Sequence, residues 1–286
     1  MKNNLFRLVI LVFLNVLVCN ALATDYVSSV RSYQEGKNII ITYELSKQSN
    51  ISVSVSTDGG KTYKTLSSIN GDFGSNVKPG SRKIVWDVLS EYENFKFFEV
   101  CFKVESNFYN GHEYVDLGLP SGTLWATCNV GASEPEEYGD YFAWGETSAK
   151  SRYTGSNYTY HNYPQTLPLV KDVANRYWGH GWRMPTKEEQ DELRNSSYTT
   201  WIWTLRDGIN GYKITSKLNG NSIFLPAAGR RIDSVLEYEG NLGYYWSSSS
   251  KNKLGEAYYL SLSSRALDWY YTGCYKGLSV RPVLNK

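Results

Sequence analysis

The stretch GWRMPTKEE at residues 181–189 marks a change from extended chain to helix. Thr186 and Glu189 stand three positions apart, the spacing at which each side chain accepts a hydrogen bond from the exposed backbone N–H of the other. This capping box predicts a helix that begins at Thr186, and the polar run at residues 195–197 ends it. A second, shorter helix is predicted over residues 172–178.

The chain around these two helices is rich in short strands and in loops that contain Gly, Ser and Asn. Strands are expected after the helices over residues 211–215, 222–225, 244–248, 257–262 and 279–283. Two early helices followed by a β-rich remainder predict an α+β domain from about residue 110 to the C-terminus.

The segment before residue 106 has a different pattern. Ile51, Val53 and Val55 alternate strictly with serines, which is typical of a half-buried strand. Similar alternation over residues 39–43 and 98–104, with glycine-containing turns between strands, predicts an all-β sandwich over residues 24–106. The alternation stops at the polar link 107–111, so two separable domains are expected.

Residues 56–63, STDGGKTY, resemble the Asp-box hairpin of sialidases and other β-proteins. A sialidase propeller repeats its structural unit blade by blade, and this motif has no second copy in the sequence. The interpretation is therefore a hairpin in which the Asp58 side chain holds the backbone of the turn.

The N-terminus predicts export. A basic start, an apolar run over residues 8–18 and Ala21-Leu22-Ala23 form a secretory signal peptide, expected over residues 1–23. No later apolar run has spanning length, so no integral membrane segment is expected after its removal. The net charge of +2 gives no electrostatic reason to propose a nucleic-acid partner. The expected location is the periplasm, the cell surface or the extracellular medium.

A series of motifs follows the link in a fixed order. They are NGHEYVDLGLPSG (110–122), LWATCNVG (124–131), YGDYFAWGE (138–146), GWRMPTKEE (181–189), LPAAGR (225–230), YWSS (245–248) and GLSVRPV (277–283). In this order they resemble the Fibrobacter succinogenes major paralogous domain family over residues 110–286. The resemblance implies a C-type-lectin-like fold, more distantly similar to formylglycine-generating enzymes. The N-terminal segment resembles the immunoglobulin-like β-sandwiches that precede such domains.

Within this resemblance, Cys128 and Cys274 lie near the two ends of the domain, and we expect a disulfide between them. Formylglycine-generating enzymes use a reactive pair of cysteines near the C-terminus, where this chain has only Cys274. One departure from the family is Gln190, where an aromatic or aliphatic residue is usual. The inward face of that helix is therefore expected to depend on Leu193.

The sequence contains no recognisable catalytic constellation. Its three histidines are scattered, and no metal or cofactor is expected. The acidic cluster at residues 134–140 lacks the lectin calcium signatures and is interpreted as a solvated loop, although calcium binding and sugar hydrolysis by a carboxylate pair both remain open. We therefore expect a protein that is not an enzyme.

Aromatic residues crowd the last quarter of the chain. Thr272-Gly273 is a turn signal, so we expect Asp268 to Gly273 to form a loop. We predict ligand-binding residues at Trp269, Tyr270, Tyr271 and Tyr259. The expected function is recognition of a glycan or a surface protein. A carbohydrate-active hydrolase and a structural subunit of a surface assembly are the alternatives.

Overall fold

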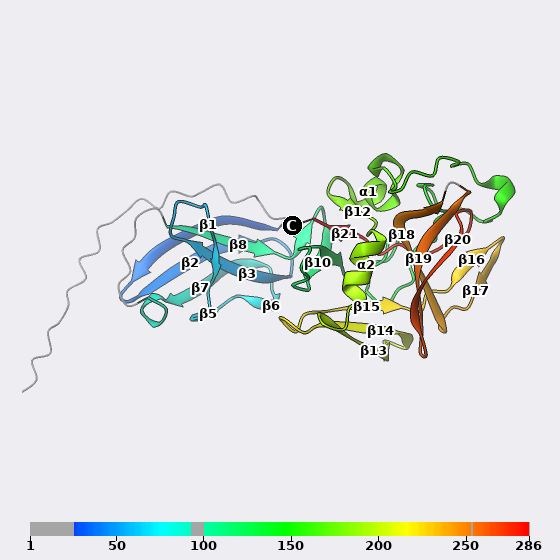
Figure 1. The fold of residues 1–286 in the computed structure, drawn as a ribbon. Helices are drawn as coiled ribbons and strands as arrows, with labels where there is room; N and C mark the ends of the chain where they lie inside the picture. The colour runs from blue at the N-terminus through cyan, green and yellow to red at the C-terminus, as the bar shows by residue number, and fades with distance from the viewer. Residues whose placement is uncertain (1–25, 93–99, 253, 286) are drawn as a thin grey trace, which may run out of the picture. The chain divides into compact units, whose positions relative to one another are not determined.

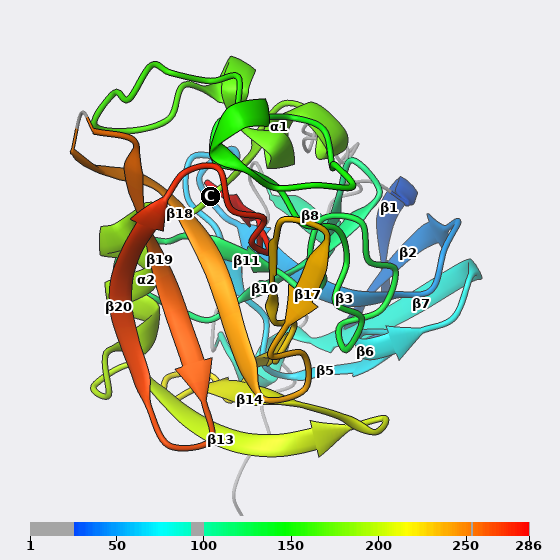
Figure 2. The same ribbon diagram turned by 90° about the vertical axis from the view of Figure 1, so that its right-hand side faces the viewer.

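The computed structural model describes residues 26–92, 100–252 and 254–285 of the chain. The predicted signal peptide lies outside these residues. The chain divides into two compact units, residues 1–108 and 109–286, and the division falls inside the link expected at residues 107–111. That the two units fold independently stays a prediction. Both are built mainly from antiparallel strands (Figures 1 and 2).

The first unit contains two sheets. Their strand orders are β1-β2-β7-β5 and β4-β3-β6, with β8 paired to β3. The elements are β1 (Val27–Glu35), β2 (Asn38–Leu45), β3 (Ser49–Ser56), β4 (Lys64–Thr65), β5 (Ile69–Gly71), β6 (Gly74–Val77), β7 (Gly80–Asp87), a 3-10 helix (Val88–Ser90) and β8 (Cys101–Ser106). The alternation predicted for β3 is confirmed, because Ile51, Val53 and Val55 are all buried. Their side chains enter one core together with Ile41 of β2 and Trp86 of β7, so the two sheets bury a shared interior.

The motif at residues 56–63 forms a hairpin between β3 and β4. The Asp58 carboxylate accepts hydrogen bonds from the backbone N–H groups of Lys61 (3.0 Å) and Thr62 (2.9 Å) and from the Ser56 hydroxyl (2.6 Å). These bonds hold the pKa of Asp58 well below its usual range, the Ser56 hydroxyl contributing most. The interpretation of Asp58 as the residue that holds the turn is confirmed.

The second unit contains several small sheets and two α-helices. The sheet orders are β12-β21-β11-β10-β9, β13-β14-β15, β16-β17 and β18-β19-β20. The strands are β9 (Phe108–Tyr109), β10 (His112–Asp116), β11 (Leu124–Ala126), β12 (Trp182–Arg183), β13 (Thr199–Arg206), β14 (Ile209–Ser216), β15 (Ser222–Pro226), β16 (Arg230–Ile232), β17 (Val235–Glu237), β18 (Leu242–Asn252), β19 (Glu256–Ser263), β20 (Leu267–Gly273) and β21 (Val283–Leu284). Short 3-10 helices occupy Gly155–Asn157 and Leu169–Lys171.

Both predicted helices are confirmed, as α1 (Val173–Trp178) and α2 (Lys187–Arg194). Asp172 caps α1 by accepting a hydrogen bond from the N–H of Ala174, and both bonds of the Thr186–Glu189 capping box are present at α2. Gln190 is buried and donates a hydrogen bond to the carbonyl of Trp246 (3.1 Å). The amide nitrogen of a polar residue is therefore bonded inside the core at a position where an apolar residue is usual in the family that the motifs resemble, whereas its Oε1 has no hydrogen-bond partner among the described residues.

The strand expected over residues 279–283 is mostly wrong, because only Val283 and Leu284 form a strand there. Ser279 makes an isolated parallel bridge to Tyr245 instead. The interior of this region is held by indole and guanidinium groups that bond to loop carbonyls, so extended chain is fixed without a continuous ladder. The Trp246 indole, for example, donates to the carbonyl of Phe142 (2.7 Å).

Candidate functional site

The expected ligand-binding residues lie on the sheet formed by β18, β19 and β20, in which β20 is an edge strand (Figure 2). The loop expected from Asp268 to Gly273 is wrong. These residues pair with β19 along their whole length, so the cross-strand ladder outweighs the local turn signal of Thr272 and Gly273.

The register of this sheet assigns each ring to a face. Tyr271 lies opposite Tyr258, and Trp269 lies opposite Leu260, two positions along the same strand. Since directly opposed residues share a face and faces alternate along a strand, Tyr258, Trp269 and Tyr271 share one face. Tyr259 and Tyr270 are paired on the other face. The four expected residues therefore lie on two opposite faces of the sheet.

Tyr258, Trp269 and Tyr271 form the first surface together with two lysines. The Lys187 ammonium lies 5.0 Å from the ring centroid of Trp269 and 5.8 Å from that of Tyr258. The Lys251 ammonium lies 5.2 Å from the ring centroid of Tyr271 and 5.5 Å from that of Tyr258. These separations are within the range of cation–π attraction. We call these five residues the aromatic–lysine surface.

The rings of this surface differ in exposure. Tyr271 is 52% exposed, whereas Trp269 and Tyr258 are half-buried. A hydrogen bond with the Tyr258 side chain is the main cause that raises the pKa of Lys251 above its ordinary value. Lys251 is therefore a cation at neutral pH, and it stands beside an accessible ring.

Helix α2 is bonded to the strand that carries two rings of the aromatic–lysine surface. Lys187 opens α2 and pairs with Asp191 at 2.6 Å, and the Trp269 indole N–H donates a hydrogen bond to the same carboxylate. Arg194, in the last turn of α2, donates to the Asp268 carboxylate (3.0 Å) and to the carbonyl of Leu267 (3.2 Å). These bonds connect the helix to the edge strand, so the rings are held on two regular elements.

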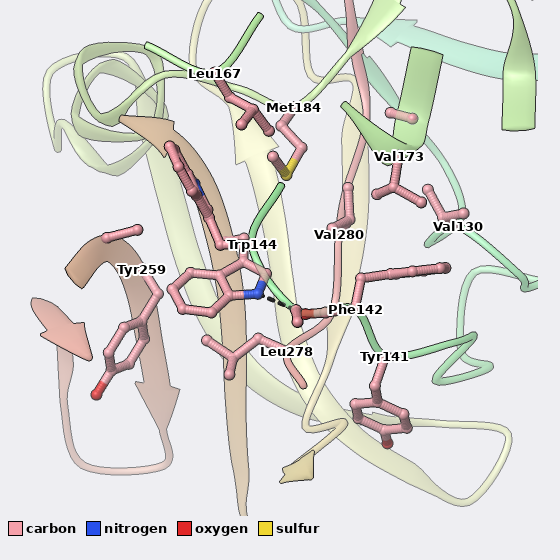
Figure 3. Close-up of a cluster of buried hydrophobic side chains, with 14 of the residues drawn as sticks. Val130, Tyr141, Phe142, Trp144, Leu167, Val173, Met184, Tyr259, Leu278 and Val280 are labelled. Atoms are coloured by element: carbon pink, nitrogen blue, oxygen red, sulfur yellow. Dashed lines mark hydrogen bonds between the residues drawn. The ribbon is translucent and has the colours of Figure 1, made fainter. Parts of the chain in front are cut away.

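The opposite face of the sheet carries a row of tyrosines. Tyr270 stacks on Tyr259 at a centroid distance of 6.1 Å, and Tyr259 contacts Tyr244 at 5.7 Å. Tyr259 and Tyr244 belong to the buried core, and Figure 3 shows Tyr259 among its neighbours. Tyr259 is therefore a core residue, and Tyr270, which is 51% exposed, is the accessible ring on this face at the edge strand.

Trp269 and Tyr271 were expected from the sequence as site residues, whereas Lys187, Lys251 and Tyr258 were not. The repeated Tyr-Tyr pairs gave a signal for Tyr258, since one ring of each pair must face away from the other. No local pattern relates Lys187 to Trp269, which is 82 positions further along the chain (269 minus 187). Only the fold brings these two together.

The expected disulfide between Cys128 and Cys274 is wrong, because both residues are free thiols. Burial raises the pKa of Cys274 to about 12 and also raises the pKa of Cys128. Each sulfur has its own polar neighbour, since Cys128 contacts the carbonyl of Ser133 and Cys274 bonds to the side chain of Tyr158. Placement in one domain indicated proximity, but a disulfide also needs matched Cα separation and direction.

The acidic cluster is engaged in local bonds. Glu137 accepts hydrogen bonds from the backbone N–H groups of Ser133 (2.7 Å) and Glu134 (3.3 Å), and Glu136 pairs with Arg206 at 3.0 Å. Within residues 26–92, 100–252 and 254–285, no cluster of three or more His, Cys, Asp or Glu side chains is arranged to hold a metal ion.

No protein-family model, curated protein or solved structure gives a significant match to this chain. In the part of the chain that the structure describes, no helix has both the length and the apolar character needed to cross a bilayer.

Proposed function

We propose that this chain is an exported, non-catalytic recognition protein that binds a glycan through the aromatic–lysine surface. The proposal includes a C-type-lectin-like fold for the second unit and an immunoglobulin-like fold for the first. The ordered motifs at residues 110–286 and the basic, apolar leader at residues 1–23 support this proposal.

One observation carries the choice of site. Tyr271 exposes half of its surface although it lies in a regular strand, with Lys251 and Tyr258 beside its ring. Burial of an aromatic ring is favourable, so a ring held open in a fixed position is available to a ligand without prior rearrangement. Rigid aromatic residues commonly dominate the energy of binding surfaces.

The chemistry of the surface suits a sugar. A pyranose ring has apolar C–H faces and a polar rim of hydroxyl groups, so it can stack on a flat aromatic ring while its rim meets polar neighbours. Tyr258 and Tyr271 supply the rings, and Lys187 and Lys251, whose ammonium groups lie over these rings, supply hydrogen-bond donors for the hydroxyl groups. A protein ligand would use the same rings, so the test must separate the two.

The test compares substitutions of two tyrosines that are similarly exposed, one at the proposed site and one elsewhere. The mature chain, residues 24–286, is screened on a glycan array as wild type, Tyr271→Ala and Tyr33→Ala. Tyr33 lies on β1 in the first unit and is 51% exposed, so its loss controls for removal of a half-exposed tyrosine. We expect glycan binding that Tyr271→Ala abolishes and Tyr33→Ala retains.

Two results would contradict this proposal. Binding that survives Tyr271→Ala would place the site elsewhere. Absence of binding to every glycan, with capture of a surface protein that depends on Tyr271, would replace the glycan by a protein ligand at the same surface.

A further inference from the structure

Strand β13 (Thr199–Arg206) is an edge strand of a different sheet and was not expected from the sequence. Among the residues that the structure describes, it pairs only with β14, in the order β13-β14-β15 (Figure 1). From Thr199 to Leu205 the sequence TTWIWTL contains neither a charged residue nor a proline. Ile202 is 60% exposed and Leu205 is 64% exposed. Long, uncharged and apolar edge strands attract further strands, and proteins usually protect them.

Two other long edge strands, β20 and β1, carry such protection. In β20, the Asp268 carboxylate accepts a hydrogen bond from the backbone N–H of Trp269 (2.7 Å), and Arg194 donates to the carbonyl of Leu267. In β1, charged Arg31 follows a shift in register. Charged side chains and bulges discourage strand addition. β13 has neither device between Thr199 and Leu205, which sets it apart from the other two.

Strand β13 is also held in an extended form. Its eight residues pair one to one with β14, and the turn between them places Asp207 at φ +46° and Gly208 at φ +83°. These values suit a type I′ hairpin, whose twist matches that of the strands. Trp201 and Trp203 pack on Tyr212 at 5.4 and 5.2 Å, and the Trp201 indole donates to the carbonyl of Leu193 (3.1 Å). The open edge is therefore preorganised for pairing.

The composition of β13 defines what can pair with it. An added strand would lie beside Trp201 and Trp203 on one face and beside Ile202 on the other, so charged side chains at these positions would lose hydration without a partner. The added strand must therefore be uncharged at these positions, and β13 itself meets this requirement. In an antiparallel pair of copies, the two Arg206 side chains lie at opposite ends, so the pairing brings no like charges together.

We propose that two copies of this chain associate through antiparallel pairing of β13 with β13, about a two-fold axis. Their three-stranded sheets then join into one continuous sheet. A two-fold contact of this kind is closed, because each copy offers the same strand once and no edge remains on β13 for a third copy. The dimer presents two aromatic–lysine surfaces, although the association does not depend on the proposed glycan function.

The test measures molar mass in solution. Sedimentation velocity of residues 24–286 is compared across protein concentrations for wild type, Ile202→Lys and Leu218→Lys. Leu218 lies in the turn after β14 of the same sheet and is highly exposed, so it controls for a new surface lysine away from the edge. We expect a dimer for wild type and Leu218→Lys. Ile202→Lys should dissociate more than about tenfold more readily, because it brings two ammonium groups together near the axis.

Hydrogen exchange provides a second measurement on the wild-type chain, which decides the question if Ile202→Lys does not fold. We expect protection of peptides from residues 199–206 to rise with protein concentration, while protection of residues 267–273 stays constant. A monomeric wild type, an Ile202→Lys dimer of unchanged affinity, or exchange in β13 that is independent of concentration would each overturn the proposal.

Discussion

Aromatic side chains in the second unit fall into two groups, one buried and bonded to loop backbone and the other at a surface. The indoles of Trp144 and Trp246 are buried and donate to the carbonyls of Ser247 (2.9 Å) and Phe142 (2.7 Å), so they fix loop backbone. On β20, the Trp269 indole donates to a carboxylate of α2, and Tyr271 remains half exposed. The two groups differ in the neighbours of the ring, which are backbone carbonyls in the first group and charged side chains in the second. A ring bonded to backbone carbonyls secures the fold, whereas a ring bordered by charged side chains forms a surface.

Arg281 is a charged residue that, like the buried indoles, donates hydrogen bonds to backbone carbonyls. It is buried, and it donates to the Asn129 side chain (2.9 Å) and to the carbonyls of Ala126 (3.1 Å) and Thr127. The Ala126 carbonyl lies at the last residue of β11, and the Thr127 carbonyl lies just after it, where the regular strand has ended. Side-chain donors therefore take the place of a β ladder around this core.

The largest effect is expected at Trp246. Trp246→Ala removes a fully buried ring and leaves the Phe142 carbonyl without its indole donor, so it should lower the free energy of unfolding by about 3–5 kcal/mol. Urea denaturation of the mature chain measures this loss, with Tyr33→Ala as the control. A loss below about 1 kcal/mol would show that the buried indoles do not secure these loops.

The second-largest effect is a pH dependence of the free energy of unfolding that is due to Asp172. This residue also joins separate segments of the core. Its carboxylate accepts from the backbone N–H groups of Ala174 (2.9 Å) and Met184 (2.7 Å), yet burial raises its pKa from 3.8 to about 6. The folded chain therefore binds a proton more tightly than the unfolded chain. Its contribution to stability is complete below about pH 4 and is lost as the pH rises through about 6.

The measurement compares unfolding free energies of wild type and Asp172→Asn at pH 4 and pH 7. The wild-type value should fall relative to the variant by about 2.5 kcal/mol over this interval, since Asn does not titrate. A difference that stays constant or moves in the opposite direction would mean that the two backbone donors keep Asp172 ionised in spite of burial.

Substitution of Trp269 should destabilise the protein by an amount between the values for the buried and the surface groups. Trp269→Ala removes a half-buried ring, its hydrogen bond to Asp191 and its contact with the Lys187 ammonium, so a loss of about 2 kcal/mol is expected. Thermal denaturation of the variant gives this loss. A destabilisation as large as that of Trp246→Ala would assign Trp269 to the structural group and leave Tyr258 and Tyr271 as the accessible rings.

The smallest effect on stability is expected at Tyr271. Because half of its surface is exposed at an edge strand, Tyr271→Ala should change the free energy of unfolding by no more than about 0.5 kcal/mol. Thermal denaturation beside Tyr33→Ala checks this value. A loss above about 2 kcal/mol would indicate that the ring is needed for folding and would weaken its assignment to binding.

The sequence predicted those features that depend on neighbouring residues. The Thr186–Glu189 capping box placed helix α2 correctly, and the alternation around Val53 placed β3. The strand β13 was missed although Trp201 and Trp203 alternate with polar and β-branched residues and Asp207-Gly208 follows them as a hairpin turn. This pattern is sufficient to predict a hairpin.

Features that depend on distant residues were not predictable. The local turn signal at Thr272-Gly273 suggested a loop, but pairing with β19 makes it the end of a strand. Cys128 and Cys274 share one unit, yet both are free thiols. The lysines of the aromatic–lysine surface come from α2 and β18, and only tertiary packing brings them to the rings of β19 and β20.

The affinity of Tyr271→Ala for a glycan tests the proposed function most directly. The strongest glycan of the array is titrated into wild type, Tyr271→Ala and Tyr33→Ala, and each dissociation constant is measured at a temperature where all three are folded. We expect Tyr271→Ala to bind about 30-fold more weakly, the equivalent of about 2 kcal/mol, with an unchanged melting temperature and with Tyr33→Ala equal to wild type. Equal affinity of Tyr271→Ala and wild type would contradict recognition through the aromatic–lysine surface.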